Sequence, residues 1–145
     1  MDGADGLTLS LTNSLAQIDR AAWNACANPA GLPFDPFVSW EFLEALESSG
    51  CAVPRQGWAP HHVLARRGKD LVGVAPLYLK SHSQGEYVFD RGWADALYNA
   101  GGAYYPKAQG AVPFTPATGR RLLTRDPNDH ETEKMLALGA IEIAR

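Results

Sequence analysis

The order of hydrophobic and polar residues predicts an α/β chain that begins with a strand and two helices. Residues Leu7–Leu11 alternate between apolar and polar, which is typical of a half-buried strand. Asp19 precedes an alanine-rich segment, and we expect a short helix there that ends before Pro29. A second amphipathic helix is expected over Phe37–Ser48, because its apolar side chains share one side until Gly50 stops it.

A β-hairpin is predicted in the middle of the chain. Two strand-like runs between His62 and Leu79 are joined by Gly68–Asp70, where a glycine and polar residues suit a tight turn. Pro76 has no backbone N–H to give to a neighbouring strand. We therefore expect its strand to lie at an edge, to be bulged, or to separate from its neighbour there.

The second half of the chain is less regular. The segment Ser81–Lys107 is rich in aromatic and charged residues, and a short helix is expected over Trp93–Tyr98. A strand is expected at Ala111–Phe114, interrupted by prolines and continued at Arg121–Leu123.

The last element is predicted to be a helix with a clear start. Asp126 suits the cap and Pro127 the first helical position, and acidic residues follow in the first turn. The helical pattern runs to Arg145 with no glycine, proline or polar tail to end it. We therefore expect the chain to be truncated, so that residues 1–145 form one incomplete domain.

Composition narrows the function classes. The 145 residues are 46% hydrophobic and 20% charged, which suits one globular domain. The net charge is -3 and the Lys and Arg residues are scattered along the chain, which argues against DNA as a partner. The first residues lack the features of a signal peptide, and no run approaches the roughly 20 apolar residues of a membrane span. Two isolated cysteines, Cys26 and Cys51, predict neither a disulfide framework nor a metal site. A cytoplasmic location is expected.

Several separated motifs together resemble one known family. They are Pro36-Phe37-Val38-Ser39, Phe42-Leu43 with Ala45-Leu46-Glu47 and Gly50, Gly57-Trp58-Ala59-Pro60-His61-His62, Ala75-Pro76-Leu77-Tyr78-Leu79-Lys80, Ser83-Gln84-Gly85-Glu86-Tyr87-Val88-Phe89-Asp90, Tyr104-Tyr105-Pro106-Lys107 and Pro113-Phe114-Thr115-Pro116-Ala117-Thr118-Gly119. In this order they resemble the start of the FemAB-like N-acyltransferases, from about Ser14 onward.

The resemblance implies a fold and a reaction. The fold would be a truncated Gcn5-related N-acetyltransferase-like domain, with a mixed, mostly antiparallel sheet flanked by helices. A further strand and a second acetyltransferase-like domain would lie outside this chain. The protein would move an acyl or aminoacyl group from acyl-CoA or aminoacyl-tRNA to an amine, for example on a peptidoglycan-type precursor, and this chain would form the acceptor side. A small-molecule acceptor is the other partner expected.

One departure argues against donor binding by this domain. An acetyltransferase that holds coenzyme A usually opens its central helix with a glycine-rich loop whose amides bind pyrophosphate. Here the stretch Thr124–His130 has no glycine, includes Pro127 without an amide, and carries two carboxylates that would repel phosphate. No cofactor is therefore expected on this chain.

Candidate catalytic residues follow the hairpin. Glu86 and Asp90 are expected to act on the acceptor amine, with Glu86 as the first choice to take its proton, while Lys80 and Ser83 would bind substrate. The alternative is that both carboxylates only cap or pair with the aromatic segment.

Further substrate contacts are expected from the aromatic segment and the turn after it. They are Trp93, Tyr98, Tyr104, Tyr105, Lys107 and Thr118. The aromatic faces would line a sugar or peptide groove, or would serve as core packing under a long loop. Lys107 would meet a phosphate or carboxylate, or be solvated.

Two histidines and one serine are expected to have structural roles. His61 and His62 are adjacent and would point to opposite faces of a strand, so no metal site is expected, and Ser39 is expected to cap a helix.

Two functions remain open: the acceptor-side domain of an N-acyltransferase, and a non-catalytic module that recognises a cell-wall peptide, a glycan or a protein. An open sheet edge beside the fourth strand would also allow self-association.

Overall fold

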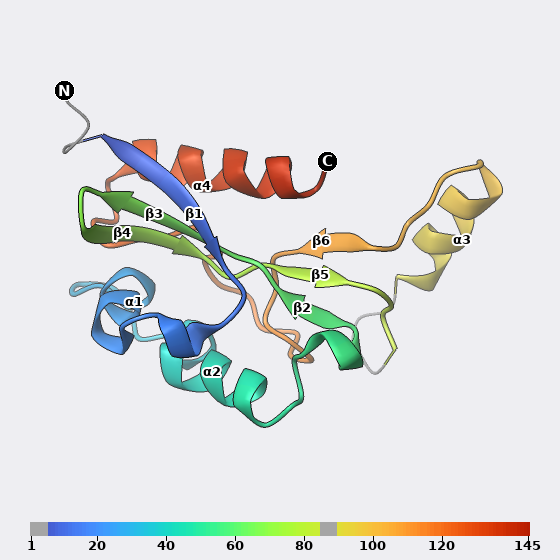
Figure 1. Cartoon of the computed structure of the whole chain (residues 1–145), viewed down its shortest axis with the longest axis horizontal. Helices are drawn as coiled ribbons and strands as arrows, with labels where there is room; N and C mark the ends of the chain where they lie inside the picture. Colours follow the sequence, from blue (N-terminus) through green and yellow to red (C-terminus); the bar gives the residue numbers. More distant parts are fainter. Residues whose placement is uncertain (1–5, 85–89) are drawn as a thin grey trace.

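The computed structural model describes residues 6–84 and 90–145 as two antiparallel sheets flanked by helices (Figure 1). The elements are β1 (Leu7–Thr12), α1 (Arg20–Ala27), α2 (Trp40–Ser48), β2 (Trp58–Pro60), β3 (His62–Arg67), β4 (Asp70–Ala75), β5 (Tyr78–Lys80), α3 (Arg91–Asn99), β6 (Lys107–Gln109), β7 (Leu123–Thr124) and α4 (His130–Ile143). Short 3-10 turns, η2 (Leu15–Gln17), η3 (Pro36–Val38) and η4 (Pro54–Gln56), lie between them.

The first sheet has the strand order β1-β3-β4-β7, and every pair in it is antiparallel. The predicted hairpin is confirmed as β3 and β4, with Gly68 at φ 60° in the turn, a backbone conformation that glycine adopts without strain. A bulge between Ala65 and Arg66 shifts the register within this hairpin. Pro76 follows the end of β4, and the chain there leaves the first sheet for the second.

Helices cover the two faces of the first sheet (Figure 1). One cluster joins α1 and α2 to the sheet, with Trp23, Leu43 and Leu64 in its centre. The other joins α4 to the opposite face through Val63 and Leu136. The alternation of apolar side chains along β3 accounts for both contacts, because neighbouring residues of a strand point to opposite faces.

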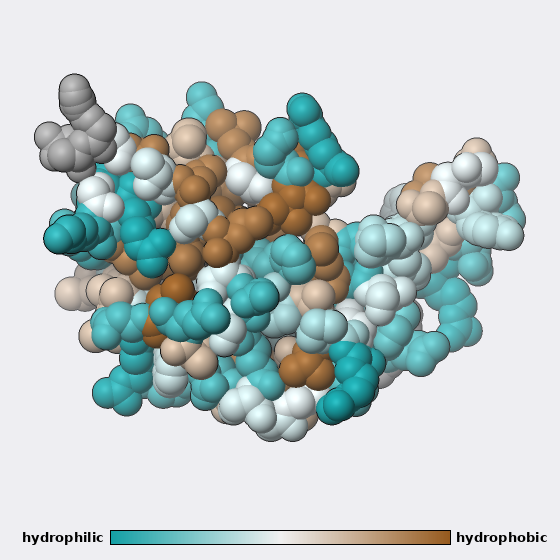
Figure 2. Space-filling view, in the orientation of Figure 1, coloured by the Kyte–Doolittle hydropathy of each residue, from teal (hydrophilic) through white to brown (hydrophobic). Residues whose placement is uncertain are grey.

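Close packing fixes α4 on its face. A β-carbon added at Gly73 would lie 2.5 Å from Thr132 Cγ2 and 3.1 Å from Leu136 Cδ1, so only a residue without a side chain lets the helix approach β4 this closely. Apolar side chains also reach the surface near this helix (Figure 2): Leu138 on α4 is 48% exposed and Ile141 57%.

The second sheet has the order β2-β5-β6 and is also antiparallel. Its own small core contains Ala52, Trp58 and Tyr78, with Leu46 of α2 packed against them. Beyond this sheet α3 projects from the body of the molecule (Figure 1), and none of its residues is buried.

The two N-terminal helices form at their predicted caps. Asp19 accepts a hydrogen bond from the backbone N–H of Ala22 (2.9 Å), and Ser39 Oγ accepts one from Phe42 (3.3 Å). The second helix begins at Trp40 rather than Phe37, because Pro36–Val38 form a separate 3-10 turn.

In the second half, the prediction of a strand at Ala111–Phe114 is wrong, and the prediction of its continuation at Arg121–Leu123 is confirmed only at Leu123. Ala111–Phe114 is a turn and not a strand, and Phe114 has φ 60°, which no strand accommodates. The continuation is the two-residue strand β7, which pairs with Gly73 and Val74 only.

The last helix begins three residues later than predicted. Asp126 accepts a hydrogen bond from Asn128 N (3.0 Å) within a turn, whereas Asp129 caps α4 by accepting from Thr132 N (3.1 Å). Thr132 is fully buried against the sheet, so packing selects the later start.

Candidate functional site

A polar cluster forms where β6 meets the start of α3. Asp90 is its centre: its Oδ2 accepts hydrogen bonds from Tyr104 (2.8 Å) and from the Lys107 ammonium, and its Oδ1 accepts one from Tyr105 (3.1 Å). The Tyr105 hydroxyl also lies 2.6 Å from Ser83 Oγ. Pairing of β6 with β5 brings these residues together, although up to 24 positions of sequence, from 83 to 107, separate them.

The electrostatics of the cluster keep Asp90 ionised. Burial raises the pKa of this carboxyl, but the hydrogen bonds from Lys107, Ser83, Tyr104 and Tyr105 outweigh burial and lower the pKa below its ordinary value. Burial lowers the pKa of Lys107, and the contacts with Asp90 and Tyr104 more than reverse that effect, so its pKa is raised. Asp90 is therefore a fixed anion that holds a cation and two phenols in place.

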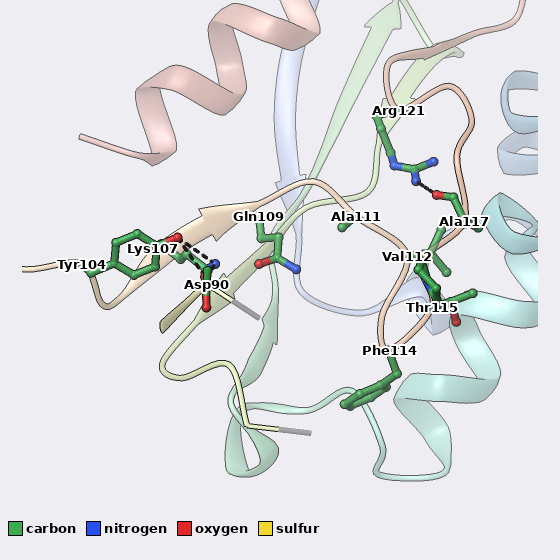
Figure 3. A pocket seen from close by; sticks show the side chains of 11 residues that line it. Asp90, Tyr104, Lys107, Gln109, Ala111, Val112, Phe114, Thr115, Ala117 and Arg121 are labelled. Carbon is green, nitrogen blue, oxygen red and sulfur yellow. Dashed lines mark hydrogen bonds and ion pairs between the residues drawn. The ribbon is translucent and has the colours of Figure 1, made fainter. Parts of the chain in front are cut away.

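A pocket of about 320 Å³ opens beside this cluster (Figure 3). Its two cations lie at separate ends, with Lys107 beside Asp90 and Arg121 across from them. The Arg121 guanidinium donates hydrogen bonds to the carbonyls of Ala117 (2.5 Å) and Arg120 (3.2 Å), which fix its direction. The pocket is lined by Asp90, Tyr104, Lys107, Gln109, Ala111, Val112, Phe114, Thr115, Pro116, Ala117 and Arg121.

The structure brings half of the predicted site residues together. Ser83, Asp90, Tyr104, Tyr105 and Lys107 make one hydrogen-bonded group. This arrangement can hold a ligand with polar groups against a charged, partly buried wall.

Other predicted residues lie elsewhere. Trp93 (75% exposed) and Tyr98 (78%) lie on the projecting α3 and do not line the pocket beside Asp90. Thr118 is exposed on the loop between Ala117 and Arg121, and its side chain does not line the pocket. Lys80 is fully buried, with Nζ 3.5 Å from the ring centroid of Trp58. Glu86 lies outside the described residues.

Sequence reasoning missed four polar or aromatic residues of the pocket wall. They are Gln109, Phe114, Thr115 and Arg121. Phe114 falls in the segment predicted as a strand, and Thr115 belongs to the Pro113–Gly119 motif, from which only Thr118 is predicted to contact substrate. Arg121 falls in the predicted strand continuation Arg121–Leu123, and that prediction gives no reason to expect its side chain at a pocket.

Sequence reasoning also missed a buried hydrogen-bonded pair, Glu47 and His62, at the junction of the two sheets. His62 is fully buried, and its Nε2 lies 2.8 Å from Glu47 Oε2, while its Nδ1 accepts a hydrogen bond from the backbone N–H of Leu77 (3.1 Å). The Glu47 Oε1 accepts from Leu15 N (2.9 Å). This pair ties α2 to the junction between the two sheets.

The described residues contain no group of three or more His, Cys, Asp or Glu side chains arranged to hold a metal ion. Cys26 is buried, and its burial raises the pKa of the thiol to about 12, whereas Cys51 is exposed. Within residues 6–84 and 90–145, none of the helices combines the length and the apolar character needed to cross a membrane.

A comparison with protein families finds a match over nearly the whole chain. The FemAB-like family model, described as peptidoglycan biosynthesis/recognition, matches residues 14–145. This match confirms the resemblance predicted from the separated motifs. No curated protein and no solved structure matches the chain.

Proposed function

The chain belongs to the FemAB-like family of peptidoglycan biosynthesis and recognition proteins, and from that premise we propose that it is the acceptor-side domain of an N-acyltransferase. The pocket beside Asp90 and Lys107 would bind an amine-bearing, peptidoglycan-type precursor. By the same resemblance, we propose an acetyltransferase-like fold, with the activated donor held mainly by a second domain. A cytoplasmic location is a separate part of the proposal.

The observation that carries this proposal is the fixed polar wall of the pocket. Asp90, Tyr104 and Lys107 hold one another by hydrogen bonds, so their order does not have to be created when a ligand binds. Arg121 supplies a second cation at the other end of the pocket. A muropeptide offers carboxylates and amides to such groups, along with the amine that would react.

The proposed reaction is direct aminolysis. The neutral amine nitrogen attacks the acyl carbonyl carbon, a C–N bond forms, and the C–O bond of an aminoacyl-tRNA or the C–S bond of an acyl-CoA breaks. The amine proton passes to a carboxylate, for which we propose Glu86, and the leaving oxygen or sulfur takes up a proton. Asp90 is a positioning group in this scheme, because its lowered pKa makes it a weak base.

The N-terminus of α4 supports placing the donor outside this domain. Asp129 accepts hydrogen bonds there from the backbone N–H and the hydroxyl of Thr132 (3.1 and 2.6 Å). A carboxylate thus already occupies the place where a pyrophosphate would meet the helix amides.

A second candidate function is recognition without catalysis. Asp90 is the one carboxylate among the described residues that line the pocket, and its hydrogen bonds hold it ionised. A wall of this kind suits binding of a cell-wall peptide or glycan as well as it suits catalysis.

A transfer assay separates the two functions. The protein, extended through its proposed second domain, is incubated with labelled aminoacyl-tRNA or acyl-CoA and a muropeptide that carries a free amine. We expect labelled product, and we expect Glu86→Gln to abolish transfer while muropeptide binding is kept. The exposed Glu142→Gln is the matched control. Binding without transfer from either donor would favour recognition; absence of both would refute the proposal.

A further inference from the structure

Three polar side chains are completely buried in the second sheet: Trp58, Tyr78 and Lys80, here called the buried donor layer. Within the described part of the chain, nothing accepts a hydrogen bond from Trp58 Nε1 or from the Tyr78 hydroxyl. The fold does pair another buried indole, since Trp23 Nε1 donates to Val38 O (2.9 Å). Buried donors without partners are rare because losing water costs free energy, so these two need an explanation.

The strand register places the buried donor layer on the face of the sheet that carries the pocket. Trp58 is opposite Lys80, and Lys80 is opposite Lys107. Tyr78 is opposite Gln109 in the same way. Directly opposed residues of antiparallel strands project from the same face. Because Lys107 and Gln109 line the pocket, the buried donors lie beside it on that face.

Phe114 covers this layer on the pocket side. Its ring lines the pocket, is 37% exposed, and lies 5.1 Å from the Trp58 ring between centroids. Its φ of 60° is in the left-handed region, which is unfavourable for an aromatic residue. Backbone strain of this kind collects at ligand sites and switch regions, where a second conformation is used.

We propose that Phe114 moves aside when a peptide ligand binds, and that a carboxylate of the ligand then accepts hydrogen bonds from Trp58 Nε1 and the Tyr78 hydroxyl, near Lys80. This subsite rests on the proposed function, because it extends the same pocket. Burial, and then the charge of Glu47, raise the pKa of Tyr78, so its hydroxyl remains a donor at neutral pH.

The donor set selects a carboxylate over a phosphate. Two neutral donors with one ammonium nearby match the single charge and two oxygens of a carboxylate. A phosphate brings about two charges and three acceptor oxygens, and proteins usually meet it with several cations or a row of backbone amides.

The indole N–H signals of a ¹H–¹⁵N NMR spectrum test the subsite directly. Titration with N-acetylalanine should shift the Trp58 signal saturably, and the uncharged N-acetylalanine amide should bind about tenfold more weakly. Inorganic phosphate should cause no saturable shift. Absence of a Trp58 shift with the acid, or an equal response to the amide or to phosphate, would overturn the proposal.

Substitutions at the subsite give a second, independent test of the proposal. Tyr78→Phe keeps the ring and removes one donor, so affinity for N-acetylalanine should fall about tenfold. Phe114→Ala removes the ring that must move, so affinity should rise about fivefold. Phe34→Ala, at a 70% exposed position, should change nothing. Unchanged affinity in both pocket variants would overturn the subsite.

The two proposals fail separately. If a muropeptide shifts the Lys107 signals and never those of Trp58, the subsite is wrong and the proposed function stands. If N-acetylalanine shifts Trp58 and no muropeptide binds, the subsite stands and the proposed function is wrong.

Discussion

The Glu47–His62 pair makes a specific prediction about stability. Leu77 N–H points at His62 Nδ1, so the proton of a neutral ring is on Nε2, where it is donated to Glu47. The other oxygen of Glu47 accepts from Leu15 N (2.9 Å). Both carboxylate oxygens are thus needed as acceptors, and the side chain of Glu47 is only 10% exposed.

Glu47→Gln removes one of these acceptors. Whichever way the amide turns, its NH2 group faces another N–H group, of His62 or of Leu15. One charge-assisted hydrogen bond is lost and two donors are left facing each other in a buried place. Together these effects lower the unfolding free energy by about 2 to 3 kcal/mol.

Urea denaturation measures this loss, with an unchanged m-value expected if the denatured state is the same. Glu44→Gln, on the same helix and with no side-chain hydrogen bond among the described residues, is the control and should change stability by less than about 0.5 kcal/mol. The ¹⁵N shifts of His62 report its tautomer. A loss for Glu47→Gln no larger than the control, or a proton on Nδ1 in the wild type, would refute this reasoning.

Three further predictions concern the cap, the packing and the acid response. Asp129→Ala should lower the free energy of unfolding, measured with heat or urea, by about 1 kcal/mol, because Asp129 caps α4. Asp126→Ala should lower it clearly less, because Asp126 only closes a turn. Equal losses for the two variants would contradict this assignment of the cap. Gly73→Ala should lower the free energy of unfolding by about 1 to 3 kcal/mol, because the β-carbon of the new alanine would overlap Thr132 of α4. An unchanged melting temperature would argue against that contact. The pKa of Asp90 in the folded state lies below the ordinary value of 3.8. The ionised carboxylate therefore stabilises the fold fully above about pH 3.8, and this stabilisation is lost as the pH falls toward the lowered pKa. Asp90→Asn should therefore lose less stability than the wild type between about pH 4 and pH 2; parallel curves would contradict the ionised cluster.

Local patterns were enough to predict the regular parts of the fold. The hairpin follows from alternating residues around Gly68, and the start of α1 from the cap at Asp19, because both depend on neighbours in sequence. The start of α4 could not be chosen locally. Asp126 and Asp129 both resemble caps, and the burial of Thr132 decides between them.

The candidate site was predictable only in part. The residue types near Asp90 and Lys107 indicated polar chemistry, but their contact depends on β6 pairing with β5, which no sequence period encodes. Lys80 was expected at the site, and strand alternation and the packing of Trp58 bury it instead. The positive φ of Phe114 likewise depends on tertiary packing, and it replaces the predicted strand with a turn.

Calorimetric titration with a muropeptide that carries a free amine tests the central claim most directly, namely that the pocket beside Asp90 and Lys107 binds the acceptor. The wild type should bind saturably, and Asp90→Asn, which releases Lys107 and both phenols, should bind at least about tenfold more weakly. Asp70→Asn, exposed at the hairpin turn, should bind like the wild type. Equal affinity for all three proteins, or no binding to the wild type, would contradict the account.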